Sequence, residues 1–342
     1  GIIILKKSMK LNYCLTLDEI VDYNFPLDKP FYLEVNHENI TYDLIVRLSS
    51  FDEGLICCGS NAHLRTEKTK NGEIKKPPFF DRWTWYKYFD ESFIAYADPS
   101  FYYDDNITLG WFVGKETWYL EVIGKIIKNI AKNRKISNEN ILFFGSSGGG
   151  FASIGLATLL KGSKTIVNNS SFSIRDITKR HYDILLDILK NSFPDLSEEE
   201  ILDKLKHRID LIELFKYQNY VPDITYYANT YSKGDMQRGS EFINRLIDLQ
   251  KDNKLDVHYY YHEDPETKGH VPMNLNNTLN AFYSFNNPRL YEIINENKKL
   301  KKQIKKLRKK VKKNKEQLKQ IKNSKSWKLT EPLRKLKQLL KK

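Results

Sequence analysis

Apolar positions in the first 285 residues follow two different periods. Short apolar runs rich in branched and aromatic residues predict β-strands, and apolar residues three and four positions apart predict helices. The predicted strands are 13–16, 30–35, 42–48, 92–97, 141–144, 164–169, 223–229 and 255–261. The predicted helical segments are 115–134, 152–160, 177–215 and 237–251. Strands that alternate with helices indicate an α/β fold with a mostly parallel sheet.

The apolar run before Gly145 leads directly into a turn of serines and glycines, and a predicted helix follows. Strand, sharp turn and helix are the setting of a nucleophile elbow, Gly-x-Ser-x-Gly. The positions two before and two after the nucleophile pack too closely to carry a Cβ. With Ser147 as nucleophile they are Gly145 and Gly149, whereas Ser146 would place Phe144 at the first of them. We therefore predict Ser147 as the nucleophile.

The same glycine-rich turn has other interpretations. A P-loop requires Lys followed by Ser or Thr after its last glycine, but Gly150 is followed by Phe151 and Ala152. The dinucleotide-binding spacing Gly-x-Gly-x-x-Gly is also missing. A purely structural turn remains the alternative.

The last two predicted strands lead to candidates for the partners of Ser147. In this architecture the order along the chain is nucleophile, acid, histidine, each after a strand. Asp235 follows the strand 223–229 and His270 follows the strand 255–261, so we predict them as acid and base. Glu241, inside the following predicted helix, is the alternative acid.

Two other segments are candidate parts of the site. The strand 42–48 ends in small polar residues, and Ser50 in that loop is a candidate second donor to an oxyanion, with an ordinary turn as the alternative. Residues 79–86 hold five aromatic side chains and one arginine. They fit either the core or the wall of a substrate site.

Charge is distributed unevenly over the 342 residues, whose net charge is +13. Residues 290–342 hold 21 Lys or Arg and 4 Asp or Glu, so the first 289 residues carry a net charge of −4. A mildly acidic body argues against a nucleic-acid groove. The three cysteines have no zinc spacing, and we expect neither a metal nor a bound cofactor.

No apolar run is long enough to span a bilayer, and Gly1 to Leu5 is too short for the core of a signal peptide. We expect a cytoplasmic protein. Its predicted parts are a catalytic domain over 1–289 with a helical cap at about 176–216, a coiled coil over 290–323 and a tail over 324–342.

The segment 293–321 carries a heptad repeat. Positions a are Asn297, Ile304, Val311 and Leu318, and positions d are Ile293, Leu300, Leu307, Asn314 and Ile321. Branched residues and one Asn at a, with Leu at d, favour a parallel dimer. A single helix folded on the body is the alternative.

The segment 326–342 combines Trp327 and five leucines with lysines. Such a basic amphipathic end can lie on an anionic membrane surface, which would make the protein peripheral to the inner face of the cell membrane. A solvated tail or a nucleic-acid contact is the alternative for this segment.

The elbow, the late Asp235 and the Lys-Gly-His270 sequence resemble α/β-hydrolase-fold serine enzymes, and more narrowly the acyltransferases and esterases associated with bacterial capsules and accessory glycoprotein secretion. The tail from Ser326 to Arg334 resembles the ends of surface-polysaccharide glycosyltransferases and related pathway proteins. The resemblance implies an acyl-Ser147 intermediate, with the N–H of Gly148 donating to the oxyanion. The His-Gly-Gly-Gly motif of lipases is missing.

We therefore expect acyl transfer or ester cleavage on a surface glycan or its precursor, with a donor such as acetyl-CoA as substrate. The alternative from another class is an inactive hydrolase fold that serves as a scaffold in polysaccharide assembly.

Overall fold

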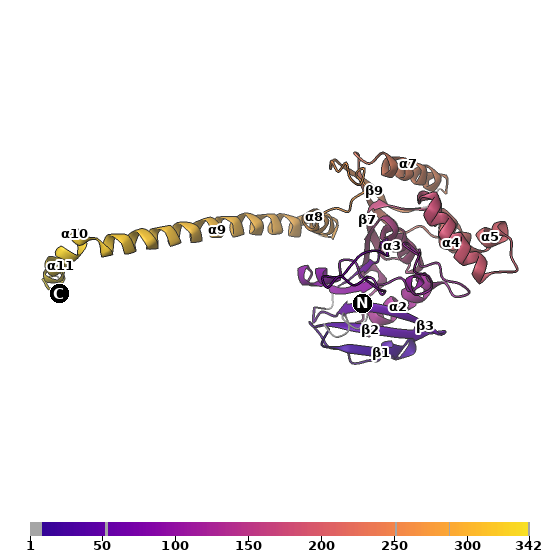
Figure 1. Ribbon diagram of the computed structural model, residues 1–342, viewed down its shortest axis with the longest axis horizontal. Helices are drawn as coiled ribbons and strands as arrows, with labels where there is room; N and C mark the ends of the chain where they lie inside the picture. Colours follow the sequence, from indigo (N-terminus) through magenta and orange to yellow (C-terminus); the bar gives the residue numbers. More distant parts are fainter. Residues whose placement is uncertain (1–8, 52–53, 250–251, 287, 341–342) are drawn as a thin grey trace. The chain divides into compact units, whose positions relative to one another are not determined.

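The computed structural model describes residues 9–51, 54–249, 252–286 and 288–340, without the side chains of 284–295 and 298. The described chain divides into two compact units, Gly1–Met273 and Asn274–Lys342. The first unit holds a nine-stranded sheet (Figure 1). The strands are β1 Asn12–Thr16, β2 Pro30–His37, β3 Ile40–Arg47, β4 Leu55–Gly59, β5 Ser92–Tyr96, β6 Ile141–Ser146, β7 Lys164–Ser170, β8 Asp223–Asn229 and β9 Leu255–Tyr260.

The sheet order is β1-β2-β3-β5-β4-β6-β7-β8-β9. The six strands from β5 to β9 in this order are parallel to one another, whereas β3 is antiparallel to both of its neighbours. The prediction of an α/β fold with a mostly parallel sheet is therefore confirmed. Because β6, β8 and β9 are parallel, the segments that follow them lie at one edge of the sheet.

The strand β4 was not predicted from the sequence. It pairs with β5 on one side and with β6 on the other, so it lies directly beside the elbow strand. All five of its residues are buried, and they include the free thiols of Cys57 and Cys58. Its sequence has one β-branched residue and no aromatic residue, so it does not stand out as a strand in the pattern of branched and aromatic runs.

Two helices cover the middle of the sheet. The helix α3, Ser147–Leu159, packs on β6 and β7, and α2, Tyr119–Asn133, packs beside it. Five short 3-10 helices connect other elements: η1 Asp18–Ile20, η2 Trp83–Tyr88, η3 Pro99–Tyr102, η4 Asn138–Asn140 and η5 Ile174–Asp176. Eleven of the thirteen residues of α3 are buried, so the start of this helix is held firmly in the core.

Three helices form an insertion between β7 and β8: α4 Lys179–Ser192, α5 Glu198–Ile209 and α6 Leu211–Gln218. A capping box begins α5, since Ser197 accepts from the N–H of Glu200 and the Glu200 carboxylate accepts from the N–H of Ser197. The helix α7, Lys233–Asp248, connects β8 to β9 and begins four residues before the predicted helix.

The second unit contains α8 Leu275–Asn286, α9 Pro288–Asn323, α10 Lys325–Leu329 and α11 Glu331–Leu339. The predicted C-terminal helix is present as α9, although the side chain of Ile293, the first position d, lies outside the described part. Gly1 to Leu5 also lie outside it. Among the described residues, no helix is both long and apolar enough to cross a membrane. Dimerisation and membrane binding stay predictions.

Candidate active site

The elbow turn brings the backbones of β6 and α3 very close together. Ser147, the first residue of α3, has a φ of +51°, in the left-handed region that L-residues rarely adopt. A Cβ added to Gly145 would lie 2.1 Å from the carbonyl oxygen of Gly149. A Cβ added to Gly149 would lie 2.4 Å from the side-chain oxygen of Asn61. The glycines two residues before and two residues after Ser147 thus both lie where a Cβ would be too close to neighbouring atoms.

We predict that Gly145→Ala lowers the free energy of unfolding by at least about 2 kcal/mol, because the new methyl group meets backbone atoms that cannot rotate away. Urea denaturation measures this loss. The matched control is Gly124→Ala in α2, whose Cβ would meet only the ends of leucine side chains, the nearest being that of Leu160 at 3.2 Å. The control is expected to change the free energy by no more than about 1 kcal/mol. Equal losses in the two variants would contradict the close-approach argument.

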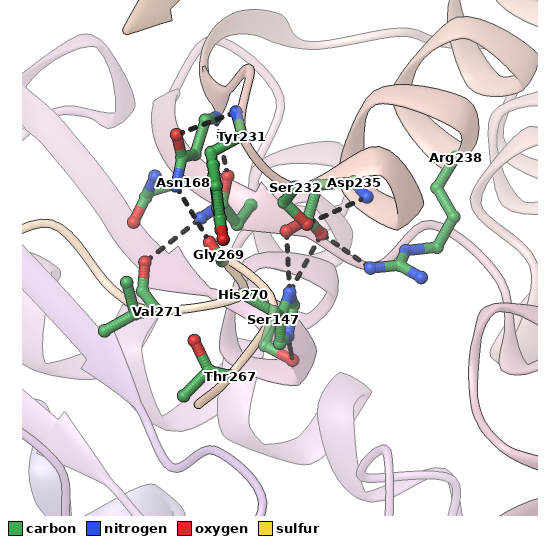
Figure 2. Close-up of polar contacts among 12 residues, drawn as sticks. Ser147, Asn168, Tyr231, Ser232, Asp235, Arg238, Thr267, Gly269, His270 and Val271 are labelled. Carbon is green, nitrogen blue, oxygen red and sulfur yellow. Dashed lines mark hydrogen bonds and ion pairs between the residues drawn. The ribbon is translucent and has the colours of Figure 1, made fainter. Parts of the chain in front are cut away.

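Ser147, His270 and Asp235 come from three segments and meet at one edge of the sheet (Figure 2). The Nε2 atom of His270 lies 3.0 Å from Oγ of Ser147. Its Nδ1 atom lies 2.9 and 2.8 Å from the two carboxylate oxygens of Asp235. The hydroxyl can therefore give its proton to Nε2 while the acid holds the other ring nitrogen, which is the arrangement that general-base activation of serine requires.

Asp235 lies in the first turn of α7 rather than in a loop. Its side chain is fully buried, and its backbone N–H donates to Oγ of Ser232, the N-cap of α7. Burial alone would raise the pKa of Asp235. The hydrogen bond and charge of His270, the Ser232 hydroxyl and the Arg238 guanidinium outweigh burial and lower that pKa. The carboxylate is therefore ionised at neutral pH.

Arg238 is a partner of the acid that the sequence analysis missed. Its Nη2 donates to Oδ1 of Asp235 at 2.6 Å (Figure 2). The signal was available, because residues three apart on a helix face each other and Asp235 to Arg238 has this spacing.

The alternative acid does not reach the histidine. Glu241 is exposed, and its Oε1 accepts from the side chain of Gln237 at 3.0 Å. Of these two candidate acids, only Asp235 contacts His270.

Buried asparagines at the ends of β7 and β8 hold the loop that carries His270. The amide of Asn169 donates to the carbonyl of Val271 at 3.0 Å. Asn229 donates to the carbonyl of Gly269 at 3.0 Å and accepts from the N–H of His262 at 2.9 Å. Gly269 has a φ of +81°, and a Cβ there would lie 2.8 Å from the ring of Tyr231. The residues on both sides of His270 are thus fixed.

The prediction that Ser50 donates to an oxyanion is wrong. Its N–H donates to Oδ1 of Asp28 at 2.9 Å. The strand β3 is antiparallel to β5, so the loop that follows β3 lies at the sheet edge where β6 begins, opposite the elbow. The neighbouring Ser49 confirms this position, because its N–H donates to Oγ of Ser92, the first residue of β5.

The loop after β4 lies beside the elbow instead. The side-chain oxygen of Asn61 accepts from the N–H of Gly149 at 3.0 Å. The N–H of Asn61 donates in turn to Oδ2 of Asp81 at 2.6 Å, and Nε2 of His63 lies 3.0 Å from the same oxygen. This network ties the loop to the turn that carries Ser147. The next residue, Ala62, faces the cavity described below.

The aromatic segment 79–86 packs behind the elbow. Nη2 of Arg82 donates to Oγ of Ser146 at 2.8 Å, and its guanidinium carbon lies 5.1 Å from the ring centre of Phe144. Phe79 is buried with Phe101 and Ile107. None of the residues 79–86 is among the described residues that line the cavity at Ser147. Of its five aromatic side chains only Phe79 is buried, so the core interpretation holds for that residue, and the other four are partly buried.

A cavity of about 910 Å³ opens at Ser147 and His270. It lies between the loop after β4, the segment leading into α4, the start of α7 and the loop before His270. The two lysines that line it, Lys233 and Lys268, have no acidic partner among the described residues. His181 of α4 also lines it. No group of three or more potential metal ligands occurs among the described residues.

No family model matches the chain, and no curated protein matches its sequence. Among solved structures, the capsule O-acetyltransferase of Neisseria meningitidis serogroup A is similar at a TM-score of 0.50 and 14% identity, over 68% of this chain and 90% of that chain. A mutant of that enzyme in complex with CoA gives a TM-score of 0.50 and 14% identity, over 67% and 90%. Acetyl xylan esterase 1 of Thermoanaerobacterium gives 0.48 and 14%, over 75% and 83%. The α/β-hydrolase-like fold is thus confirmed.

Proposed function

We propose that this chain is a serine acyltransferase or esterase that acts on O-acyl groups of a surface glycan or its precursor. One observation carries the proposal: Oγ of Ser147 lies 3.0 Å from His270, whose other ring nitrogen contacts the buried carboxylate of Asp235. A structural turn needs no such chain of three polar groups leading from a buried acid to a cavity.

In the proposed reaction, Nε2 of His270 takes the proton from Oγ of Ser147 as that oxygen attacks the carbonyl carbon of an acyl donor. The tetrahedral intermediate collapses, and the alcohol or thiol of the donor leaves with the proton from His270. The acyl-Ser147 ester is then attacked by a glycan hydroxyl or by water, which gives its proton to His270, and the acyl group leaves Ser147 as Oγ takes that proton back. Asp235 remains ionised and stabilises the imidazolium in both halves.

The proposed oxyanion donors are two backbone N–H groups. Gly148 lies at the N-terminus of α3, where the first N–H groups have no partner within the helix and the helix dipole favours negative charge. Ala62 lies in the loop after β4 and lines the cavity with Ser147. We propose Ala62 in place of Ser50.

The cavity supports a donor or acceptor larger than an acetyl ester of a simple alcohol. Its volume of about 910 Å³ lies within the usual range for small-molecule sites. The positive charges of Lys233 and Lys268 suit an anionic group, such as the phosphates of acetyl-CoA. The capsule O-acetyltransferase and its complex with CoA are consistent with this donor.

Two measurements test the proposed function. A fluorophosphonate probe should label Ser147 of the native chain, and no labelling at saturating probe would favour the scaffold interpretation. Acetyl release from p-nitrophenyl acetate, measured with and without an acceptor oligosaccharide, separates hydrolysis from transfer. Transfer predicts an acetylated sugar whose yield rises with acceptor concentration. The same assay with acetyl-CoA identifies the donor.

A further inference from the structure

The helix α9 exposes a continuous apolar stripe along one side. Six side chains at heptad positions are each about half exposed: Leu300 52%, Ile304 48%, Leu307 59%, Val311 51%, Leu318 49% and Ile321 51%. A groove of about 420 Å³ runs along the middle of the stripe, beside Ile304, Leu307 and Val311. We call these six residues, with Asn297 and Asn314, the seam.

Few interactions between side chains of α9 itself can stabilise its 36 residues as an isolated helix in water. It contains 15 Lys or Arg but only 3 Asp or Glu, so most charged neighbours repel each other. No ion pair joins two described side chains of α9. Helices gain most of their stability from burial of an apolar face, and the seam is the apolar face that α9 offers.

We propose that the seam binds the seam of a second copy of this chain, in a parallel and in-register coiled coil. Position a is branched at Ile304 and Val311, and position d is Leu at Leu300 and Leu307, the combination that favours two parallel strands. Spacings of three and four continue from Asn297 to Ile321, an average repeat of 3.5 residues. Because this repeat is shorter than one helical turn, the stripe winds slowly around the helix and favours a left-handed coiled coil over packing on a globular body.

The charges at heptad positions e and g, which flank the seam, distinguish a parallel pair of helices from an antiparallel one. Positions e are all basic: Lys301, Arg308, Lys315 and Lys322. Positions g are mixed: Glu296, Gln303, Lys310 and Gln317. An antiparallel pair places e beside e of the other helix, so its basic residues face one another along the whole of one side. A parallel pair places g beside e.

In the parallel pair only one of the four contacts joins like charges. Glu296 faces Lys301 of the other copy, an attractive pair, and Gln303 and Gln317 face basic residues without repulsion. Only Lys310 faces a like charge, at Lys315. The parallel orientation is therefore the less repulsive one.

The parallel arrangement has a consequence for the tails. Both copies of 324–342 follow the coiled coil directly in the chain, so in a parallel pair they lie together at its C-terminal end. Two basic amphipathic segments on one dimer would bind an anionic surface together, with higher avidity than either segment alone.

Cysteine cross-linking of the full chain tests the orientation. In a Cys14→Ser background, which removes the exposed native thiol, Asn297→Cys or Asn314→Cys alone should give a disulfide-linked dimer under mild oxidation. An antiparallel pair that buries the asparagines together would set position 297 against 314, so only the double variant would cross-link. Lys309→Cys, at the outward position f, is the control and should stay monomeric on a denaturing gel.

Sedimentation equilibrium tests the association itself. We expect a dimer for the full chain. The dissociation constant of the dimer should be at least about 100-fold higher for Leu307→Lys than for wild type, since a charge in the seam must either be buried or break the pair. Lys309→Glu is the matched surface control and should remain dimeric. Added NaCl should tighten the dimer, because salt screens the lysines and not the apolar contact.

A monomeric mass of the full chain at 100 µM, at every salt concentration tested, would overturn the proposal. Cross-linking only in the double variant of Asn297→Cys and Asn314→Cys would overturn the parallel orientation. Protection of the seam residues from solvent only after vesicles or nucleic acid are added would overturn the dimer. Ester turnover is measured in parallel. Leu307→Lys should keep it unchanged, so failure of the dimer and failure of the proposed enzyme activity are separate results.

Discussion

Replacing Ser147 with alanine is expected to lower ester turnover by about 10⁶-fold, the loss seen when a serine nucleophile is removed from a working triad. The change removes only Oγ, the atom that lies 3.0 Å from Nε2 of His270. The fold should persist, because alanine fits wherever serine does on this turn. Steady-state hydrolysis of p-nitrophenyl acetate measures the loss, and circular dichroism checks the fold.

The neighbouring serine is the matched control. Oγ of Ser146 accepts from Arg82 and lies behind the elbow, away from His270. Ser146→Ala should therefore keep turnover within about tenfold of wild type, while unfolding more easily because a buried hydrogen bond is lost. Loss of activity in Ser146→Ala, with activity kept in Ser147→Ala, would make Ser146 the nucleophile and contradict the argument from Gly145 and Gly149.

Replacing Asp235 with asparagine is expected to lower turnover by about 10⁴-fold, because the amide no longer fixes the ring tautomer or stabilises the imidazolium. Nδ1 of His270 contacts both oxygens of Asp235, so the substitution acts directly on the base. The matched control is Glu241→Gln, which changes an exposed carboxylate on the same helix. Steady-state hydrolysis measured for both variants at pH 7 should separate them by at least about 10³-fold. Similar rates in the two variants would remove Asp235 from the proposed mechanism.

The same substitution has a pH signature in stability. Although burial opposes ionisation, the bonds from His270, Ser232 and Arg238 lower the pKa of Asp235 in the folded chain. A lowered pKa stabilises the fold at pH above the unfolded value of about 4, and that contribution is lost as the pH falls through the folded value. Urea denaturation of wild type and Asp235→Asn should therefore differ most near pH 7 and converge in acid. A difference that grows on acidification would mean that the carboxylate is not stabilised in its ionised form.

The central part of the fold could be predicted because its signals are local. The apolar run before Gly145, the glycines around Ser147 and the order of Asp235 and His270 all follow from sequence alone. The strand β4 could not be predicted in the same way, because its five residues include one β-branched and no aromatic side chain. Its absence from the prediction also hid Asn61 and Ala62, the residues that follow it.

The error at Ser50 has a topological cause. The strands β2 and β3 form a hairpin whose two-residue turn is Glu38 and Asn39, with φ of +50° and +62°. The hairpin reverses the direction of β3 and so places Ser50 at the opposite edge of the sheet. Neither turn residue is glycine, so the sequence signal is weak for a turn in which both central residues have positive φ.

The contacts that hold the site together are long-range and lack a sequence period. Asn169 and Asn229 reach the loop of His270 across about 40 to 100 residues of chain. Their amides bond carbonyl groups that come within reach only once the sheet has formed. Arg238 is the exception, since helical spacing alone relates it to Asp235.

The positive φ of Ser147 sets folding and reactivity against each other at a single residue. An L-residue in this conformation costs about 1 kcal/mol or more relative to glycine, which adopts it freely. Selection for a stable fold alone would therefore replace Ser147 with glycine. A chain that lost its substrate would be expected to drift in that direction, gaining stability as its chemistry disappeared. The serine at this position thus marks a constraint that packing does not impose and that folding opposes.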